Sequence, residues 1–350
     1  MAISQSLAHW LRILRQAAAV GGGRWRCLPG ALLAWRDATP FVRLHFLAVA
    51  TDLGLLEELR RRPATANQLS GRLAIGNPAL LAAFLRLGAA LGELGYRAGR
   101  WSLRGRRSNA LAMPEADTMR AMVQEAVGYD AAVYAGLAAH LRGAPPGDYL
   151  GATGAVIARA SRLVEPALTP LVRSVVAERR PRRVLDVGCG TGVYLVHAAS
   201  AGGPQLTGLG VDLDAAVVEL ARQRLADARL ADRFDVRHAD IRAATLPEAS
   251  FDLVLLLQNI YYFAEDQRPG LLRRLGGLVA PGGALLLASL FAGRSLAAAH
   301  YDVLFRATAG CGPLPRRQQL DRQLRDAGFT TIRWVQLIPL ESFHAVIAQR

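Results

Sequence analysis

Lysine is absent from this chain of 350 residues, so all 42 basic side chains, which give a formal charge of +14, are arginines. Such uniformity, beside abundant alanine, indicates a coding bias rather than selection for phosphate contacts. The basic excess is also uneven, because residues 1–110 hold 16 arginines against five acidic residues. Any anionic partner is therefore expected to meet the N-terminal part of the chain.

Cysteine is scarce. The chain has three, Cys27, Cys189 and Cys311, which is an odd number, and no two of them stand close together in the sequence. A disulfide framework and a zinc site are therefore not expected, and we predict no metal site.

Unbroken apolar runs are scarce as well. Arg12 and Arg15 interrupt the stretch from Ala2 to Val20, which favours an amphipathic helix over a secretory signal. We expect this helix to serve packing or dimerisation, with binding to a membrane surface as the alternative. Residues 276–293 are apolar, but Pro281-Gly282-Gly283 in their middle predicts a turn followed by a strand. These features predict a cytoplasmic protein.

The length allows two hydrophobic cores, and the first part of the chain has the pattern of a winged helix. Apolar residues recur with helical spacing over 41–59, and Thr65 with Gln68 has the form of a helix start. A third helix is expected over 78–94, and the alternation over 96–103 predicts a hairpin. Three helices followed by a hairpin is the order of a winged helix.

After Arg183 the pattern changes to short β-rich runs that alternate with helical segments, which predicts a parallel sheet with helices on both faces. The expected strands cover 184–187, 206–211, 234–237, 253–257 and 284–289, with 331–337 and 342–348 as a closing antiparallel pair. The fold class is therefore α/β, with a Rossmann-like domain behind a mainly helical winged-helix domain. The expected regions are a winged-helix-like part over 1–112, a helical connector or lid over 113–180, and the Rossmann-like domain over 181–350.

A glycine-rich loop carries the first functional signal. Gly188, Gly190 and Gly192 directly follow the expected strand 184–187 and precede a helix, where the backbone must turn sharply and approach a ligand without Cβ atoms. Their Gly-x-Gly-x-Gly spacing differs from the Gly-x-Gly-x-x-Gly typical of dinucleotide binding, which argues against a dehydrogenase. Twenty residues later Asp212 ends the next strand, where a carboxylate accepts hydrogen bonds from both hydroxyls of a ribose.

With these motifs in this order, residues 181–350 resemble the class I S-adenosylmethionine-dependent methyltransferases. Three later segments extend the resemblance: Phe251–Val254 at the fourth strand, Val279–Ala284 at the turn into the fifth, and Ala327–Phe329 before the closing pair. Residues 52–103 are similar to the winged-helix dimerisation domain of many small-molecule O-methyltransferases.

The resemblance implies S-adenosylmethionine as the cofactor. Asp186 and the glycine loop would then lie against its methionine part, Asp212 would bind the ribose, and Asp240 would meet the adenine amino group. Gln258 and Asn259 would lie near the transferring methyl group. The implied cofactor-binding residues are Asp186, Gly188, Cys189, Gly190, Gly192, Asp212, Leu213, Asp240, Ile241 and Gln258.

The catalytic base is a separate question. Plant-type O-methyltransferases carry a catalytic histidine after the fourth strand, and Tyr261 stands at that place here. A phenol with a pKa near 10 is a poor base at neutral pH, so Tyr261 either orients the acceptor or lines the pocket. His300, after the fifth strand, is the second candidate, with a surface histidine as the alternative interpretation. A base helps only when the acceptor arrives protonated, and alignment supplies much of the rate.

We expect a homodimeric methyltransferase, joined through its N-terminal domain, that methylates a small, fairly apolar molecule at oxygen. The alternatives are methylation of such a molecule at carbon or nitrogen, an RNA or protein acceptor, and a non-catalytic binding protein. Nucleic acid is not the expected partner, because the helix over 78–91 offers only Arg86 to a base edge.

Overall fold

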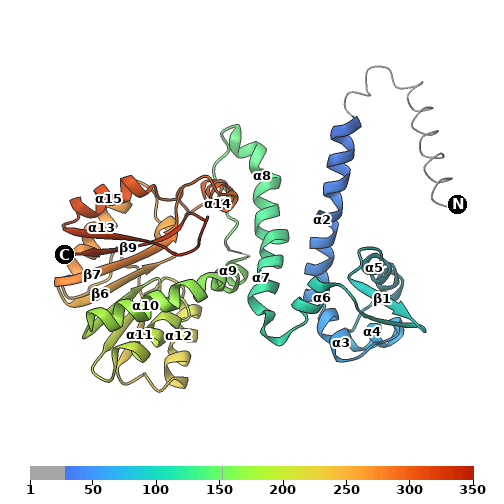
Figure 1. The fold of residues 1–350 in the computed structure, drawn as a ribbon, viewed down its shortest axis with the longest axis horizontal. Helices are drawn as coiled ribbons and strands as arrows, with labels where there is room; N and C mark the ends of the chain where they lie inside the picture. The colour runs from blue at the N-terminus through green and yellow to red at the C-terminus, as the bar shows by residue number, and fades with distance from the viewer. Residues whose placement is uncertain (1–27, 152) are drawn as a thin grey trace. The chain divides into compact units, whose positions relative to one another are not determined.

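The computed structural model describes residues 28–151 and 153–350, and the chain divides into two compact units, Met1–Val123 and Gln124–Arg350 (Figure 1). The helix predicted from Ala2 to Val20 and Cys27 lie outside the described residues. Within the described part, no single helix is long and apolar enough to cross a membrane. The pair Arg36–Asp52 and Leu55–Arg61 reaches that length and composition only together, with a bend of 72° between them.

The N-terminal unit is built from helices and one hairpin. Its elements are α2 (Leu28–Asp52), α3 (Leu55–Arg61), α4 (Ala66–Arg72), α5 (Pro78–Ala90), β1 (Leu94–Arg97), β2 (Arg100–Leu103), α6 (Arg106–Leu111) and the 3-10 turn Pro114–Ala116. The order α3, α4, α5, β1, β2 is that of the predicted winged helix. The prediction of one helix over 41–59 was wrong, because Gly54 takes a left-handed conformation, with a φ of 68°, and breaks it.

Local capping fixes these helices in the predicted places. Thr65 and Gln68 form a reciprocal capping box at the start of α4, and the Asn77 side chain caps α5 ahead of Pro78. The core of the unit joins α2, α3 and α5 through buried side chains that include Phe46 and Leu85. The third helix ends earlier than expected, at Ala90, and the hairpin begins earlier, at Leu94.

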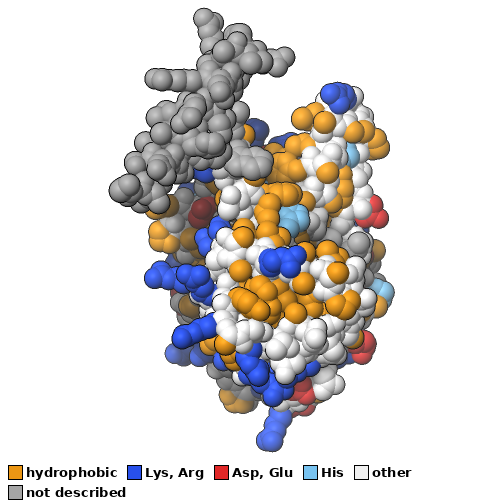
Figure 2. All heavy atoms as spheres, turned by 90° about the vertical axis from the view of Figure 1, so that its right-hand side faces the viewer, with side chains coloured by type: hydrophobic (Ala, Val, Ile, Leu, Met, Phe, Trp, Pro, Cys, Tyr) orange, Lys and Arg blue, Asp and Glu red, His pale blue; other side chains and the backbone are white. Residues whose placement is uncertain are grey.

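Several large apolar side chains of this unit remain exposed. Figure 2 shows apolar side chains gathered next to arginines on the face that it presents. The exposed residues on α2 and α5 are Leu33, Phe41, Val42, Val49, Leu80 and Leu87.

The C-terminal unit holds a seven-stranded sheet in the order β5-β4-β3-β6-β7-β9-β8. The strands are β3 (Arg183–Val187), β4 (Thr207–Asp212), β5 (Phe234–His238), β6 (Phe251–Leu257), β7 (Val279–Leu290), β8 (Thr331–Gln336) and β9 (Phe343–Gln349). β3 to β7 pair in parallel, whereas β9 pairs antiparallel with both β7 and β8. The predicted Rossmann-like sheet with a closing antiparallel pair is therefore confirmed.

Helices cover both faces of this sheet (Figure 1). Buried residues of α10 (Glu165–Arg179), α11 (Val193–Gly202) and α12 (Ala215–Asp227) form a core on one face. Those of α13 (Arg268–Leu278) and α15 (Arg317–Asp326) form a second core on the other.

The predicted turn at 281–283 lies inside β7. The pairing of β7 with β6 is interrupted between Val279 and Ala284, and Gly282 there has a φ of 76°. The turn residues thus form an irregularity within the strand rather than a loop before it.

A further group of helices begins at the boundary between the two units in the sequence, at Val123 and Gln124, and continues into the C-terminal unit. α7 (Asp117–Glu125) continues into a π-helix, Ala126–Asp130, and then into α8 (Ala131–Leu141). α8 packs on α14 (Leu296–Ala307) through Val133, Leu304 and Ala307. α9 (Gly154–Ala160) and the 3-10 turn Ser161–Val164 lead to α10.

Candidate functional site

The glycine loop after β3 is tied to both neighbouring strands of the sheet. The N–H groups of Gly188 and Cys189 donate to the carbonyl of Val211 on β4, at 2.8 and 3.1 Å. From the other side, the amide nitrogen of Asn259, just after β6, donates to the carbonyls of Val187 and Gly188 at 2.8 and 3.0 Å. A Cβ atom at Gly188 would lie 2.4 Å from that amide nitrogen. Only glycine therefore allows this close approach.

Asp212, at the end of β4, holds the tip of the loop. One of its oxygens accepts the N–H of Gly190 at 2.9 Å, and the other accepts the N–H of Asp214 at 3.0 Å. Around the position of a Cβ at Gly190, no atom of the described residues other than Gly190 and its two chain neighbours lies within 4 Å. The loop therefore leaves open space directly beside the carboxylate predicted to bind a ribose.

Asp186, the last acidic residue before the loop, is buried. Burial, and after it the charge of Asp212, raises the pKa of Asp186 to about 7. Its Oδ2 atom is buried and has no hydrogen-bond partner among the described residues. A buried acidic oxygen without a partner indicates a missing donor, and the ammonium group of a methionine moiety would be a suitable one. The acid, the open glycine loop and Asp212 thus suit the parts of S-adenosylmethionine.

The other predicted cofactor-binding residues come just after the carboxyl ends of β4, β5 and β6. Leu213 comes after β4 and is exposed, whereas Ile241 after β5 is buried. The guanidinium of Arg242 donates to both oxygens of Asp240 and holds the pKa of Asp240 below its usual range. Gln258, the first residue after β6, has a φ of 61°. In parallel sheets, ligands bind outside these carboxyl ends of the strands.

Cys189 and Gly192 complete the predicted set in the loop itself. The Cys189 side chain is buried, and burial raises the pKa of its thiol well above the usual range. A buried thiol with a raised pKa is not a nucleophile at neutral pH. Gly192 caps α11 in a left-handed conformation.

An aromatic cluster adjoins the end of β6. Tyr261 is buried, and its ring stacks on Phe305 of α14 with 4.3 Å between centroids. The rings of Tyr262 and Tyr301 pack against this pair. Burial raises the pKa of Tyr261 well above 10, so this phenol stays protonated at neutral pH. Tyr261 can therefore line or orient, but it does not supply a base.

His300, the second predicted candidate, belongs to a polar group on α14 and the π-helix. Its Nε2 atom lies 3.1 Å from an oxygen of Asp130, and its Nδ1 atom lies 2.9 Å from the hydroxyl of Tyr134. Glu125 is buried nearby, and burial followed by the charge of Asp130 raises its pKa to about 7. Sequence reasoning missed Glu125, Asp130 and Tyr134, because no periodic sequence pattern marks the π-helix Ala126–Asp130 that joins α7 to α8.

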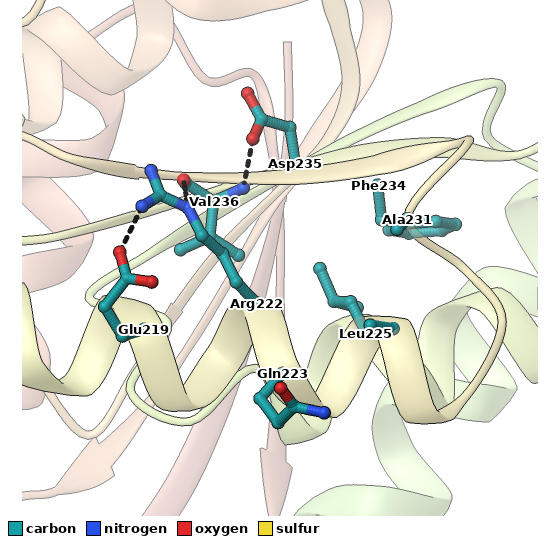
Figure 3. Close-up of a pocket in the computed structure, with 9 residues that line it drawn as sticks. Glu219, Arg222, Gln223, Leu225, Ala231, Phe234, Asp235 and Val236 are labelled. Atoms are coloured by element: carbon teal, nitrogen blue, oxygen red, sulfur yellow. Dashed lines mark hydrogen bonds and ion pairs between the residues drawn. The ribbon is translucent and has the colours of Figure 1, made fainter.

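Two open surface hollows, of about 400 and 410 Å³, lie elsewhere on the C-terminal unit. The first lies between α12 and β5, where Arg222 bonds to Glu219 and to the carbonyl of Val236 (Figure 3). None of the predicted site residues lines either hollow. The side chains that line the two hollows belong to helix and strand packing and have no part in the site described above.

Comparison with known proteins agrees with this geometry. Residues 184–283 match a family model described as a methyltransferase domain. An uncharacterized methyltransferase of Mycobacterium bovis is 45% identical over 102 residues, which cover 29% of this chain and 47% of that protein. The chain thus matches about half the length of such curated relatives. Demethylspheroidene O-methyltransferase of Cereibacter sphaeroides is 27% identical over 319 residues, covering 84% of this chain and 80% of the relative.

Solved structures share the fold over most of the chain. A mitomycin 7-O-methyltransferase has a TM-score of 0.77 at 19% identity, covering 94% of this chain and all of that one. Human N-acetylserotonin methyltransferase, solved with S-adenosylmethionine, has a TM-score of 0.72 at 18% identity, covering 92% and 97%. The domain match and the shared fold confirm the predicted architecture. The chain contains a methyltransferase domain with the Rossmann-like fold of the class I S-adenosylmethionine-dependent methyltransferases.

Proposed function

We propose that this protein is a methyltransferase that transfers the methyl group of S-adenosylmethionine to an oxygen of a small, fairly apolar molecule. The observation that carries the proposal is the arrangement around the glycine loop. Gly190 adjoins open space and bonds to Asp212, a carboxylate suited to a ribose. The loop follows Asp186, whose buried Oδ2 atom has no hydrogen-bond partner among the described residues.

The residues that would hold the cofactor divide by its chemical parts. Asp186 and the backbone at 188–192 would bind the methionine moiety, and Asp212 with Leu213 the ribose. Asp240 and Ile241 would meet the adenine, and Gln258 would lie near the methyl group. The bound cofactor supplies an electrophilic methyl carbon on a sulfonium, and the protein supplies alignment of the acceptor with it.

The aromatic cluster supports a small acceptor. Tyr261, Tyr262, Tyr301 and Phe305 offer ring surfaces close to the end of β6, and apolar walls with a few polar groups are typical of small-molecule sites. Relatives over most of the chain include an O-methyltransferase named for demethylspheroidene. Methylation at carbon or nitrogen is the second candidate, because one curated relative is named indolepyruvate C-methyltransferase.

The proposal is tested by incubating the protein with radiolabelled S-adenosylmethionine and separate pools of phenols and alcohols, amines, bulk protein and RNA. We expect label in the hydroxyl pool, as an ether that resists base. The Asp212→Asn variant serves as the binding-deficient control, and Glu248→Gln, at an exposed acid, as the matched neutral control. Label confined to protein or RNA would refute a small-molecule acceptor.

We also propose that the protein is a homodimer joined through its N-terminal unit. The support is the set of exposed apolar side chains on α2 and α5, which includes Phe41, Val49 and Leu80. Exposed apolar patches mark interaction surfaces. Light scattering should give twice the chain mass, and Phe41→Arg should shift it toward the monomer. A cytoplasmic location stays a prediction, which cell fractionation would check.

A further inference from the structure

Asn259 belongs to two neighbouring parts of the molecule. Its backbone begins the 3-10 turn Ile260–Tyr262 after β6, where its carbonyl accepts the N–H of Tyr262 at 3.0 Å. Its side chain reaches the glycine loop, where the amide nitrogen donates to the carbonyls of Val187 and Gly188 at 2.8 and 3.0 Å. One residue therefore joins the loop that would hold the methyl donor to the turn that carries part of the aromatic cluster.

The amide of Asn259 bonds at the place where the backbone pairing of β3 with β6 has ended. The last pair between these two strands joins Asp186 to Leu255. The two carbonyls that the amide meets belong to the next two residues of the chain, Val187 and Gly188. Among the described residues, the Asn259 side chain thus supplies hydrogen bonds to the β6 side of the loop that the sheet itself no longer provides.

A left-handed residue directly precedes Asn259 and turns the chain. Gln258 has a φ of 61°, which is uncommon for a residue with a side chain. Its N–H still donates to the carbonyl of Ala288 on β7 at 2.8 Å, so the strand pairing continues to Gln258 before the chain turns. Strained backbone persists where surrounding contacts hold it, and it clusters at functional sites. The conformation of Gln258 therefore indicates that the position of Asn259 matters for function.

The turn is also held from its other side, by residues beyond β6 and α14. The carbonyl of Tyr261, whose ring belongs to the aromatic cluster, accepts the N–H of Gly312 at 2.7 Å. The buried Arg268 donates from its Nε atom to the carbonyl of Phe263 at 3.1 Å. The turn is therefore fixed beside the cluster, and Asn259 is its link to the glycine loop.

The β4 side holds the same loop independently of Asn259. The backbone N–H groups of residues 188–190 donate to the carbonyl of Val211 and to the carboxylate of Asp212. A variant without the Asn259 amide keeps all three of these hydrogen bonds. It should therefore keep the loop as a cofactor site and lose only the fixed distance between the loop and the turn.

We propose that Asn259 is a positioning residue for methyl transfer, which fixes the methyl donor on the glycine loop relative to an acceptor at the aromatic cluster. This inference rests on the proposed function and deepens it. Alignment supplies much of the rate of such a transfer, and a misplacement of about 1 Å can cost about 100-fold. An amide suits this role because its two N–H groups serve two successive carbonyls, whereas a carboxylate has no N–H to donate.

The first test measures steady-state methylation of the phenol and alcohol pool at one fixed concentration, with S-adenosylmethionine varied. Asn259→Ala and Asn259→Asp both remove the donor, and the second keeps the size of the side chain. Each should lower the apparent kcat by about 100-fold and change the KM for S-adenosylmethionine by less than about tenfold, because β4 still holds the loop.

Asn109→Ala is the matched control. The amide of Asn109 also donates to a backbone carbonyl, that of Gly105 in the N-terminal unit, at 2.7 Å, and its loss should change neither kinetic constant. An unchanged kcat in the Asn259 variants, or a loss confined to KM, would overturn the proposal. Variants that urea titration shows to be unfolded would assign Asn259 to the stability of the sheet and would also overturn it.

Gly188→Ala gives a second, independent test. The new Cβ would lie 2.4 Å from the amide nitrogen of Asn259 and would displace that amide. Gly188→Ala should therefore lower kcat about as much as Asn259→Ala does. The double variant should lie within a few-fold of the slower single variant, because both changes break the same link. Losses that multiply in the double variant, or full kcat in Gly188→Ala, would overturn the proposal.

Hydrogen exchange of the full-length protein, saturated with S-adenosylhomocysteine, gives a readout other than activity. Asn259→Ala should lower the protection of the backbone N–H groups at 260–263, because the turn is no longer held to the glycine loop. Protection of β4 should stay as in the wild type, and Asn109→Ala should change neither segment. Wild-type protection of the turn in Asn259→Ala would overturn the proposal.

Calorimetry with S-adenosylhomocysteine separates this inference from the proposed function. We expect Asn259→Ala to bind the nucleoside within about tenfold of the wild-type affinity, because three hydrogen bonds still hold the loop to β4. If the wild type itself gives no binding heat, the proposed function fails. If both proteins bind and Asn259→Ala keeps full kcat, only the inference fails. Binding lost in Asn259→Ala alone would make Asn259 a cofactor-binding residue and would overturn its positioning role.

Discussion

Gly188→Ala should mainly lower the stability of the fold, whereas Gly190→Ala should mainly weaken cofactor binding. Both glycines have positive φ angles, of 64° and 53°, so alanine at either position costs about 1–2 kcal/mol of conformational strain. At Gly188 the new Cβ would also lie 2.4 Å from the amide nitrogen of Asn259. That side chain must then move and lose its hydrogen bonds to the carbonyls of Val187 and Gly188.

The lost hydrogen bonds set the size of the difference between the variants. Each contributes about 1 kcal/mol, so Gly188→Ala should lower the free energy of unfolding by about 3–4 kcal/mol and Gly190→Ala by about 1–2 kcal/mol. At Gly190 the Cβ meets no atom within 4 Å among the described residues beyond its two chain neighbours. It would instead fill the space proposed for the cofactor, so Gly190→Ala should weaken S-adenosylhomocysteine binding by about tenfold or more.

Urea unfolding measures the first quantity, and isothermal titration calorimetry measures the second. The reasoning would be refuted if Gly190→Ala proved as unstable as Gly188→Ala. It would also be refuted if Gly190→Ala bound S-adenosylhomocysteine as tightly as the wild type. The cofactor would then not occupy the open space beside Asp212.

Three further predictions concern the acids and the phenol of the site. Asp212→Asn should weaken S-adenosylhomocysteine binding by about 10-fold to 100-fold, because hydrogen bonds to a charged acceptor contribute about 1.5–3 kcal/mol; calorimetry checks this, and unchanged affinity would contradict it. The raised pKa of Asp186, about 7 against 3.8, stabilises the folded protein fully below pH 3.8, and this stabilisation is lost as the pH rises through 7. Relative to Asp186→Asn, the wild type without cofactor should therefore lose up to about 4 kcal/mol of unfolding free energy between pH 4 and 7; urea unfolding at each pH checks this, and parallel curves would contradict it. Tyr261→Phe should keep the methylation rate within about tenfold of wild type, because this phenol is not a base; a loss of 100-fold or more in steady-state assays would show that its hydroxyl takes part in the chemistry.

The sheet was predictable because its signals are local and periodic. The β-rich runs after Arg183 and the glycine loop at 188–192 give the strand order of a Rossmann-like domain once parallel pairing is assumed. The pairing of Thr65 with Gln68 placed the start of α4 correctly, since these side chains bond within the first turn of the helix. Boundaries were less certain at glycines, and Gly54 divided a helix that apolar spacing alone showed as continuous.

The acceptor side was not predictable in the same way. Asp130 lies in the π-helix Ala126–Asp130, and no periodic pattern marks such an insertion. His300 meets Asp130 across 170 residues of sequence, and Tyr129 meets Thr308 across 179. Contacts of this kind depend on how α8 packs on α14. The sequence alone does not show this packing, because the two helices are far apart along the chain.

The most direct test of the account is a crystal structure of the protein soaked or co-crystallised with S-adenosylhomocysteine. We expect the ribose hydroxyls on the carboxylate of Asp212 and the amino acid part of the nucleoside against the glycine loop, with its ammonium group bonded to Oδ2 of Asp186. Saturating nucleoside that leaves this loop empty, or that binds elsewhere, as in the hollow between α12 and β5, would contradict the account.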